Sequence, residues 1–390
     1  MKQRVYHKDI IFVLIASFFY FSSPMVVTPL ITGFSGSLGA SAVLMGMIGG
    51  LTNLCSLICR PFVGNLADKL SKYKLSFIGA GLITLSCIGY IFATTPFTVV
   101  IARIVNGAGF ACCSVCMSVW MSNMLPKEKI GSGMGFYGMM NALAMALAPA
   151  IGVSVYQAFG YRPAFIIAAV CAVATMVIIQ FIGDKGQPVP PKPQEPGQSP
   201  APKRLQLVDA KVVPIAAIIM LFTIPYCATQ SFLVSYVDAR QLPLTVSLFF
   251  PLYAAVLLVL RFSMKSLFDK LPFWVFLTFS SICACASILC LTWMQSNFVM
   301  FLAALFMAGG YGIMCSVCQS TAILLAGEGK RGLANSTYYI GLDLGMALGP
   351  MLGGVIFGHF SAQWFYPLFL LTVPLALLVF WLSKMGKGAA

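Results

Sequence analysis

Residues 60–70 read RPFVGNLADKL, and residues 261–271 read RFSMKSLFDKL. Two further pairs of segments match in the same way: AMALAPAIG at 144–152 with GMALGPMLG at 345–353, and CSVC at 113–116 with CSVC at 315–318. The members of each pair lie 201 or 202 residues apart. A nearly constant separation over unconnected segments indicates an internal duplication, so we expect two halves of the same architecture.

The composition of the 390-residue chain is that of a membrane protein. Hydrophobic residues make up 59% of the chain and charged residues 9%, whereas a soluble domain carries about 25% charged residues. A helix needs about 20 mostly apolar residues to cross a bilayer. Such segments are predicted near residues 10–32, 41–62, 75–94, 97–122, 132–157, 163–183, 212–236, 244–262, 273–293, 297–325, 333–357 and 364–383. The predicted fold is an all-α integral membrane protein with twelve transmembrane helices in two six-helix bundles.

The positions of the basic residues predict the orientation in the bilayer. With the N-terminus inside, all but three of the 24 basic residues fall on the cytoplasmic side, the exceptions being Arg103, Arg162 and Arg240. Basic residues concentrate in cytoplasmic loops. We therefore predict a multi-pass protein of the plasma membrane with both termini in the cytoplasm. The net charge of +14 is then a topology signal and does not indicate a nucleic-acid partner.

A proline-rich segment divides the chain into its halves. Seven prolines fall between Pro188 and Pro202, a composition that favours extended chain. We predict an N-terminal bundle over 1–183, a cytoplasmic linker over 184–210 and a C-terminal bundle over 211–390. Because an even number of spans separates equivalent positions, the two bundles form a parallel repeat about an axis along the membrane normal.

Three signatures resemble the major facilitator superfamily, and the resemblance covers essentially the whole chain. GNLADKLSKYK at 64–74 is similar to the family's loop between the second and third helices, with Ser71 in place of a glycine. Arg103, followed by Gly107 and Gly109, resembles the signature of the fourth helix.

A proline-glycine pattern resembles the one typical of the antiporter branch, which includes drug and metabolite efflux proteins. It is partial at Pro149 and Gly152 and more complete at Gly345, Gly349, Pro350 and Gly353. We expect these residues to serve close helix packing, since small residues let helix backbones approach within a membrane.

The resemblance implies a monomeric secondary transporter that works by alternating access, without a cofactor or metal and without enzymatic activity. It also implies a gate that opens and closes at the cytoplasmic helix ends. The residues that match the family's gating loop are Gly64, Asp68, Lys69 and Lys72, and Asp269 is the equivalent of Asp68 in the weaker copy.

Asp343 is the one acid among ten that falls inside a predicted span. An ionisable residue there costs about 2.5–3.5 kcal/mol on insertion scales, which makes it a functional candidate. Its repeat counterpart is Ala142, so the fold does not require an acid. We predict that Asp343 takes and releases a proton, because burial favours its neutral form and wetting favours the carboxylate. The alternative is a structural acid held by Tyr339 or by a backbone group of a neighbouring helix.

Arg103 is predicted to be the single basic residue well inside a span, and its repeat counterpart is Leu305. Its partner is an acid, a substrate anion or a set of backbone carbonyls, all of which a guanidinium can bind. We group it with Asp343 as a candidate for proton coupling. A structural network is the alternative.

Aromatic and amide side chains within the spans are candidates for substrate contact, with packing as the alternative. They are Tyr20, Asn141, Tyr226, Gln230 and Tyr339. A single buried cation argues against phosphates and multiply charged anions as substrates. A path rich in aromatic residues and methionine suits bulky lipophilic molecules.

The sequence therefore predicts proton-coupled efflux of lipophilic or amphipathic small molecules. An importer that moves a small nutrient together with protons is the alternative, because no residue encodes the direction. An enzyme is disfavoured, since the predicted spans hold one acid and no histidine.

Overall fold

The computed structural model describes residues 2–125, 130–187, 208–263, 271–325 and 331–383. The helices are α1 (Lys2–Ser37), α2 (Ala42–Lys69), α3 (Lys72–Phe92), α4 (Pro96–Met124), α5 (Ile130–Phe159), α6 (Tyr161–Ile178), α7 (Val213–Ala239), α8 (Phe249–Ser263), α9 (Phe273–Thr292), α10 (Asn297–Met307), α11 (Ile313–Leu325), α12 (Arg331–His359), α13 (Phe365–Phe369) and α14 (Thr372–Leu382). Within these residues, eleven helical stretches are long and apolar enough to span a membrane, and Val246–Arg261 is a shorter apolar helix.

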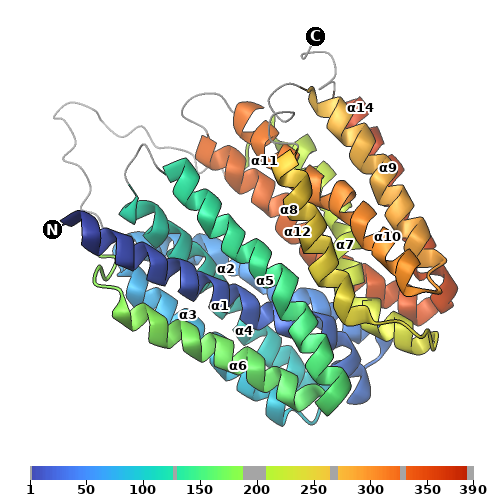
Figure 1. Cartoon of the computed structure of the whole chain (residues 1–390), viewed down its shortest axis with the longest axis horizontal. Coiled ribbons are helices and arrows are strands. Elements are labelled where there is room, and N and C mark those ends of the chain that lie inside the picture. Colours follow the sequence, from blue (N-terminus) through green and yellow to red (C-terminus); the bar gives the residue numbers. More distant parts are fainter. Residues whose placement is uncertain (1, 126–129, 188–207, 264–270, 326–330, 384–390) are drawn as a thin grey trace.

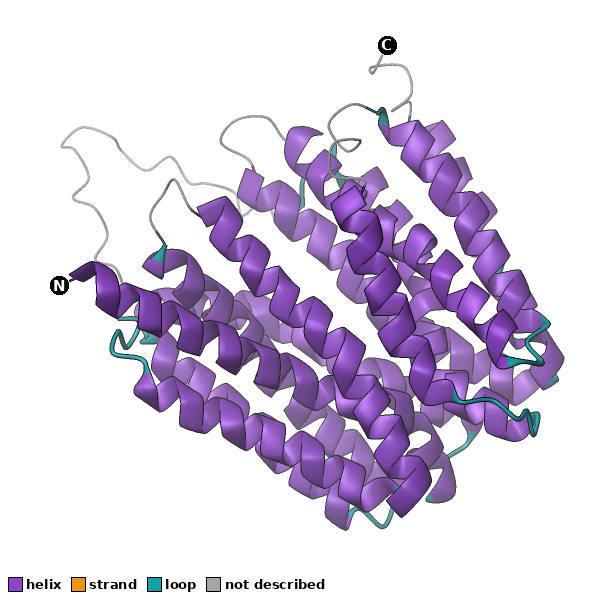
Figure 2. Cartoon of the chain, viewed as in Figure 1, coloured by secondary structure: helices purple, strands orange, loops and turns teal. Residues whose placement is uncertain are grey.

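The helices form two groups that follow the chain (Figure 1). Helices α1–α6 are the first half and α7–α14 the second. Within the halves, α1 packs on α5 and α6, α3 packs on α4, and α12 packs on α7. Between the halves, α2 packs on α12, α5 on α8 and α1 on α7. The repeat equates α2 with α8 and α5 with α12, so the first two of these contacts are equivalent. The predicted all-α membrane fold with two bundles is confirmed, and Figure 2 shows short loops where the connections between helices are described.

Large apolar side chains cover the outside of both halves. Phe62, Phe92, Phe159 and Trp381 are each more than 70% exposed. A soluble monomer rarely exposes contiguous apolar surface of this extent. These outer faces therefore contact lipid, and the chain is a multi-pass membrane protein.

The two halves approach most closely at one end of the molecule. We call the end where α1 begins and α14 ends the terminal end, and the opposite end the far end. Near the far end, a Cβ on Gly50 would lie 2.2 Å from the Ala347 carbonyl, and one on Gly354 would lie 2.5 Å from the Ala42 carbonyl. Toward the terminal end, a Cβ on Gly64 would meet nothing within 4 Å. Helices α5 and α8 likewise diverge toward the terminal end (Figure 1).

Two predicted spans are interrupted. The span predicted at 297–325 contains a π-helical segment, Ala308–Gly312, between α10 and α11. Three of its five residues are glycines, which tolerate the altered backbone. The span predicted at 364–383 breaks between α13 and α14, because Pro374 has no N–H to donate to the Leu370 carbonyl.

Candidate functional site

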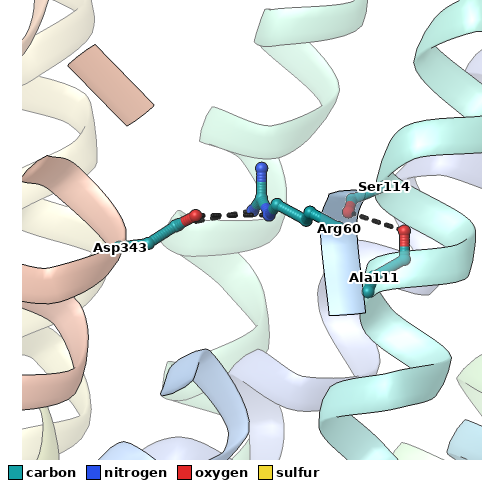
Figure 3. Close-up of polar contacts among 4 residues, drawn as sticks. All are labelled: Arg60, Ala111, Ser114 and Asp343. Carbon is teal, nitrogen blue, oxygen red and sulfur yellow. Dashed lines mark hydrogen bonds and ion pairs between the residues drawn. The ribbon is translucent and has the colours of Figure 1, made fainter. Parts of the chain in front are cut away.

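Asp343 of α12 forms an ion pair with Arg60 of α2. The Nε of Arg60 lies 3.2 Å from Oδ2 of Asp343, and Nη2 donates a hydrogen bond of 3.3 Å to Oδ1. The Asp343 side chain is 5% exposed and that of Arg60 28%. Figure 3 shows the two side chains extending toward each other from their helices. The Nη2 contact is the hydrogen bond of the pair, and the Nε contact adds a second close approach of opposite charges.

This pairing corrects two expectations from the sequence. The partner of Asp343 is Arg60 and not Tyr339 or a backbone group. Arg103 is not the single basic residue inside a span, because Arg60 lies within the apolar stretch Ala42–Gly64. In the sequence, Arg60 stands at the edge of the predicted span 41–62, which placed it on the cytoplasmic side. In the structure α2 continues through Pro61 to Lys69, so Arg60 lies more than two turns before its end.

Tyr339 completes the surroundings of the ion pair. It lies one helical turn before Asp343 on α12, and the guanidinium carbon of Arg60 is 6.0 Å from its ring centre. Gln319 of α11 donates a hydrogen bond of 3.3 Å to the Tyr339 hydroxyl. The Tyr339 ring thus supports the Arg60 cation, while Gln319 fixes the orientation of its hydroxyl.

The ion pair joins the two halves on the terminal-end side of their tight contact. The backbones of α2 and α12 touch at Gly50 and Gly354, and Asn53 donates a hydrogen bond of 3.5 Å to the Met346 carbonyl. Arg60 lies about two turns farther along α2. A long side chain bridges the helices there, so a change in the Arg60–Asp343 pair acts directly on the contact between the halves.

Arg103 binds backbone carbonyls. It is 2% exposed; its Nε donates a hydrogen bond of 2.9 Å to the Ile48 carbonyl, and its Nη2 donates one of 2.7 Å to the Gly49 carbonyl. Both acceptors belong to α2, which places Arg103 of α4 in a network within the first half. Of the three partners that the sequence left open, this is the set of carbonyls.

In the first half, Tyr20 of α1 and Tyr137 of α5 share a short hydrogen bond between their hydroxyls. Phe110 of α4 lies 6.2 Å from the Tyr20 ring. Asn141 is one turn beyond Tyr137, and its side-chain oxygen is buried without a hydrogen-bond partner. Tyr137 was not among the candidates from sequence, because nothing local to it predicts that it meets Tyr20.

In the second half, three tyrosines from different elements meet. The ring of Tyr226 on α7 stacks on Tyr311 with 4.1 Å between centres and 14° between planes. Tyr253 of α8 lies 5.3 Å from Tyr226. Tyr311 belongs to the π-helical segment, and such segments are frequent at functional sites. Phe222, Tyr226 and Tyr311 line a small apolar cavity together with Met307. We call Tyr226, Tyr253 and Tyr311 the tyrosine cluster.

Gln230 lies nearer the far end of α7 than the tyrosine cluster. It is 4% exposed, and its amide nitrogen is 3.5 Å from the sulfur of Met25 on α1. One residue on, the Ser231 carbonyl accepts a hydrogen bond from the Thr32 hydroxyl. Gln230 is therefore part of the contact between the halves.

The predicted gating residues differ in how much of them the structure describes. Asp68 and Lys69 lie in the last turn of α2, with side chains outside the described part, and Asp269 lies outside the described residues. Lys72 begins α3 and is 3% exposed, and its backbone N–H donates a hydrogen bond of 2.9 Å to the Gly186 carbonyl. The chain that follows α6 therefore covers Lys72.

The residues predicted for helix packing lie at close approaches. On α12, a Cβ on Gly345 would be 2.8 Å from the Met220 carbonyl, and one on Gly349 would be 2.6 Å from the Ile224 carbonyl of α7. Gly152 of α5 approaches the Val26 carbonyl of α1 in the same way, at 2.6 Å. Of the remaining three, Pro149 is buried in α5, Gly353 faces Phe232, and Pro350 faces Gly46 and Gly49 of α2.

The family model of the Major Facilitator Superfamily matches residues 13–328 and 274–387. The chain belongs to the Major Facilitator Superfamily. The resemblance to the superfamily drawn from the loop at 64–74 and from Arg103 with Gly107 and Gly109 is thereby confirmed.

Two relatives match this chain over about half of its length. The multi-drug resistance efflux pump PmrA of Streptococcus pneumoniae is 26% identical over 224 residues, which cover 55% of this chain and 51% of PmrA. The uncharacterized MFS-type transporter YhhS of Escherichia coli is 28% identical over 188 residues, covering 45% of this chain and 46% of YhhS. The chain thus spans about half the length of the curated relatives it matches.

Solved structures share the Major Facilitator fold over nearly the whole chain. A peptide transporter, POT, crystallised with sulfate, superimposes with a TM-score of 0.79 at 13% identity and covers 98% of this chain and 97% of its own. The nucleoside transporter NupG gives a TM-score of 0.79 at 12% identity, covering 96% and 99%. At these identities the likeness establishes the fold.

Proposed function

We propose that this chain is a secondary transporter that works by alternating access, and that it exports amphipathic small molecules in exchange for protons. The observation that carries the proposal is the Arg60–Asp343 ion pair. It links α2 to α12 and thus one half to the other. An ionisable group inside a membrane span costs free energy, which favours a functional role for this pair. The family membership and the transporters among its relatives support the same reading.

The proposed cycle uses the ion pair as a proton-sensitive link between the halves. In the paired state the Asp343 carboxylate accepts hydrogen bonds from Arg60. A proton on Asp343 removes its charge and with it the attraction to the guanidinium, so the halves lose one contact on the terminal-end side. Release of the proton restores that contact. Proton binding and the arrangement of the halves are then linked reciprocally.

The proposed orientation follows from the basic residues and the packing. With both termini in the cytoplasm, the far end faces outward, and the tight glycine contacts at Gly50 and Gly354 close it. The conformation is then closed to the outside, with the gating loop between α2 and α3 on the inner side. The efflux direction rests on the likeness to PmrA, which is named a multi-drug resistance efflux pump.

The test is proton-gradient-driven uptake into inverted vesicles of three aromatic dyes: one cationic, one neutral and one bearing a carboxylate. We expect uptake of at least one dye by the wild type, lost on collapse of the gradient and lost in Asp343→Asn. Vesicles that contain Arg162→Gln, a change away from the ion pair, serve as the matched control.

The possible results distinguish an exporter from an importer and test the role of Asp343. Gradient-driven movement in the opposite direction would establish an importer. Uptake unchanged in Asp343→Asn would remove Asp343 from coupling, and no gradient-dependent movement of any dye would argue against proton-driven export of such molecules.

A further inference from the structure

The ion pair between the halves has a second, incomplete copy. The repeat places Arg261 of α8 at the position of Arg60, and Ala142 of α5 at the position of Asp343. Helix α8 packs on α5, although less extensively than α2 packs on α12. The second helix pair thus keeps the guanidinium and has lost the carboxylate.

Arg261 has no charged partner among the described residues. Its side chain is half-buried, and its Nε is buried without a hydrogen-bond partner. In the described part of the chain the one ion pair is that of Arg60 with Asp343, which already engages this acid. Burying this N–H without a hydrogen-bond acceptor or a compensating anion is costly. The site is therefore electrostatically incomplete.

The incomplete site continues into the tyrosine cluster. Tyr253 and Leu257 lie two turns and one turn before Arg261, on the same face of α8, and both are buried. The Tyr253 ring lies 5.3 Å from that of Tyr226. One face of α8 therefore presents a cation at one end and aromatic rings at the other.

An amide side chain lies on α5, the helix that packs on α8. Asn141 precedes Ala142 on α5, and its side-chain oxygen is buried without a partner. By the repeat, Ala142 lies at the level of Arg261, just as Asp343 lies at the level of Arg60. The position where the first copy holds a carboxylate is thus occupied by a methyl group beside an unsatisfied amide.

We propose that Arg261 binds the carboxylate of an aromatic monocarboxylate substrate, with the tyrosine cluster holding the aromatic part. A guanidinium matches a planar carboxylate through two parallel hydrogen bonds, and stacked tyrosines favour a flat ring. The substrate carboxylate takes the place of the acid missing at Ala142. This inference rests on the proposed transport function and specifies its substrate class. It also replaces the sequence argument from a single buried cation, since Arg60 lies within the apolar stretch Ala42–Gly64 and Arg261 ends the apolar helix Val246–Arg261.

The experiment measures binding to the purified full-length chain in detergent, with naphthylacetate and its uncharged analogue naphthylacetamide. We expect the wild type to bind the acid about tenfold more tightly than the amide, as charge-assisted hydrogen bonds predict. Arg261→Gln should remove this preference. Ala142→Asp should remove it as well, because the new carboxylate occupies Arg261, whereas Ala142→Asn should keep it. Arg240→Gln, a change at the far end, is the matched control for loss of a cation.

A preference for the acid that survives in Arg261→Gln or in Ala142→Asp would overturn the inference, and so would equal or absent binding of the two probes to the wild type. If Arg261→Gln does not fold, Ala142→Asp decides alone, since it retains the guanidinium. Binding in detergent needs no proton gradient. Loss of gradient-driven transport with the preference intact would therefore count against the proposed coupling and not against this site.

Discussion

At the scale of single residues, Arg60 and Asp343 differ in their access to water, and the two single mutants should differ for that reason. Arg60→Gln leaves a 5% exposed carboxylate without its partner, whereas Asp343→Asn leaves a 28% exposed guanidinium that can reach water. Removing one partner of a fully buried pair costs about 3–5 kcal/mol. We expect Arg60→Gln to lower the free energy of unfolding by up to about 3 kcal/mol, and Asp343→Asn by less.

Denaturant unfolding in detergent checks this order of effects. The double mutant Arg60→Gln, Asp343→Asn should lose less than the sum of the two single losses, because the second change removes the charge that the first left unpaired. Strictly additive losses would mean that the two side chains do not interact in the folded protein.

Replacing Arg103 should lower the free energy of unfolding and leave proton coupling unchanged. Arg103→Lys loses the fork that donates to the Ile48 and Gly49 carbonyls, because an ammonium group cannot reproduce a guanidinium's fixed geometry. We expect the free energy of unfolding to fall by about 1–3 kcal/mol, the cost of a buried group left unsatisfied. The pH dependence of transport should stay that of the wild type. A shifted pH dependence at unchanged stability would instead place Arg103 in proton coupling.

At the scale of elements, the contact of α2 with α12 depends on glycines. A Cβ on Gly50 would lie 2.2 Å from the Ala347 carbonyl, so Gly50→Ala forces the two helices apart. We expect a loss of about 1–3 kcal/mol, typical of overpacking. Gly81→Ala on α3 is the matched control, since its nearest neighbour is the Met176 methyl at 3.9 Å. Thermal unfolding in detergent measures both, and equal behaviour of the two variants would contradict the close approach.

At the scale of the whole molecule, the far-end contact between α1 and α7 should open during each transport cycle. Thr32 of α1 donates to the Ser231 carbonyl of α7 there. With the thirteen native cysteines replaced, oxidation of the double mutant Thr32→Cys, Ser231→Cys should stop transport, and a reductant should restore it. The single mutants treated with the same oxidant are the controls. Full transport by the cross-linked protein would show that the halves do not separate at this end.

The sequence by itself determined the helices and the repeat, and it selected Asp343 as a candidate. Hydrophobic stretches, proline-rich interruptions and an acid in an apolar span are local features, and they predict spanning helices whatever those helices contact. The exceptions are also local in origin, as at Ala308–Gly312, where three glycines permit a π-helical backbone.

The tertiary structure alone decided which residues meet. That Arg60 reaches Asp343, that Arg103 binds the carbonyls of α2, and that Arg261 stays unpaired in the described part of the chain depend on which helices pack together and how each is rotated about its axis. Residues 60 and 343 are far apart in the chain, and no periodicity within either helix specifies the other as its neighbour. The repeat showed which positions are equivalent and that the second copy lacks the acid, but packing was needed to show that Arg60 and Asp343 meet.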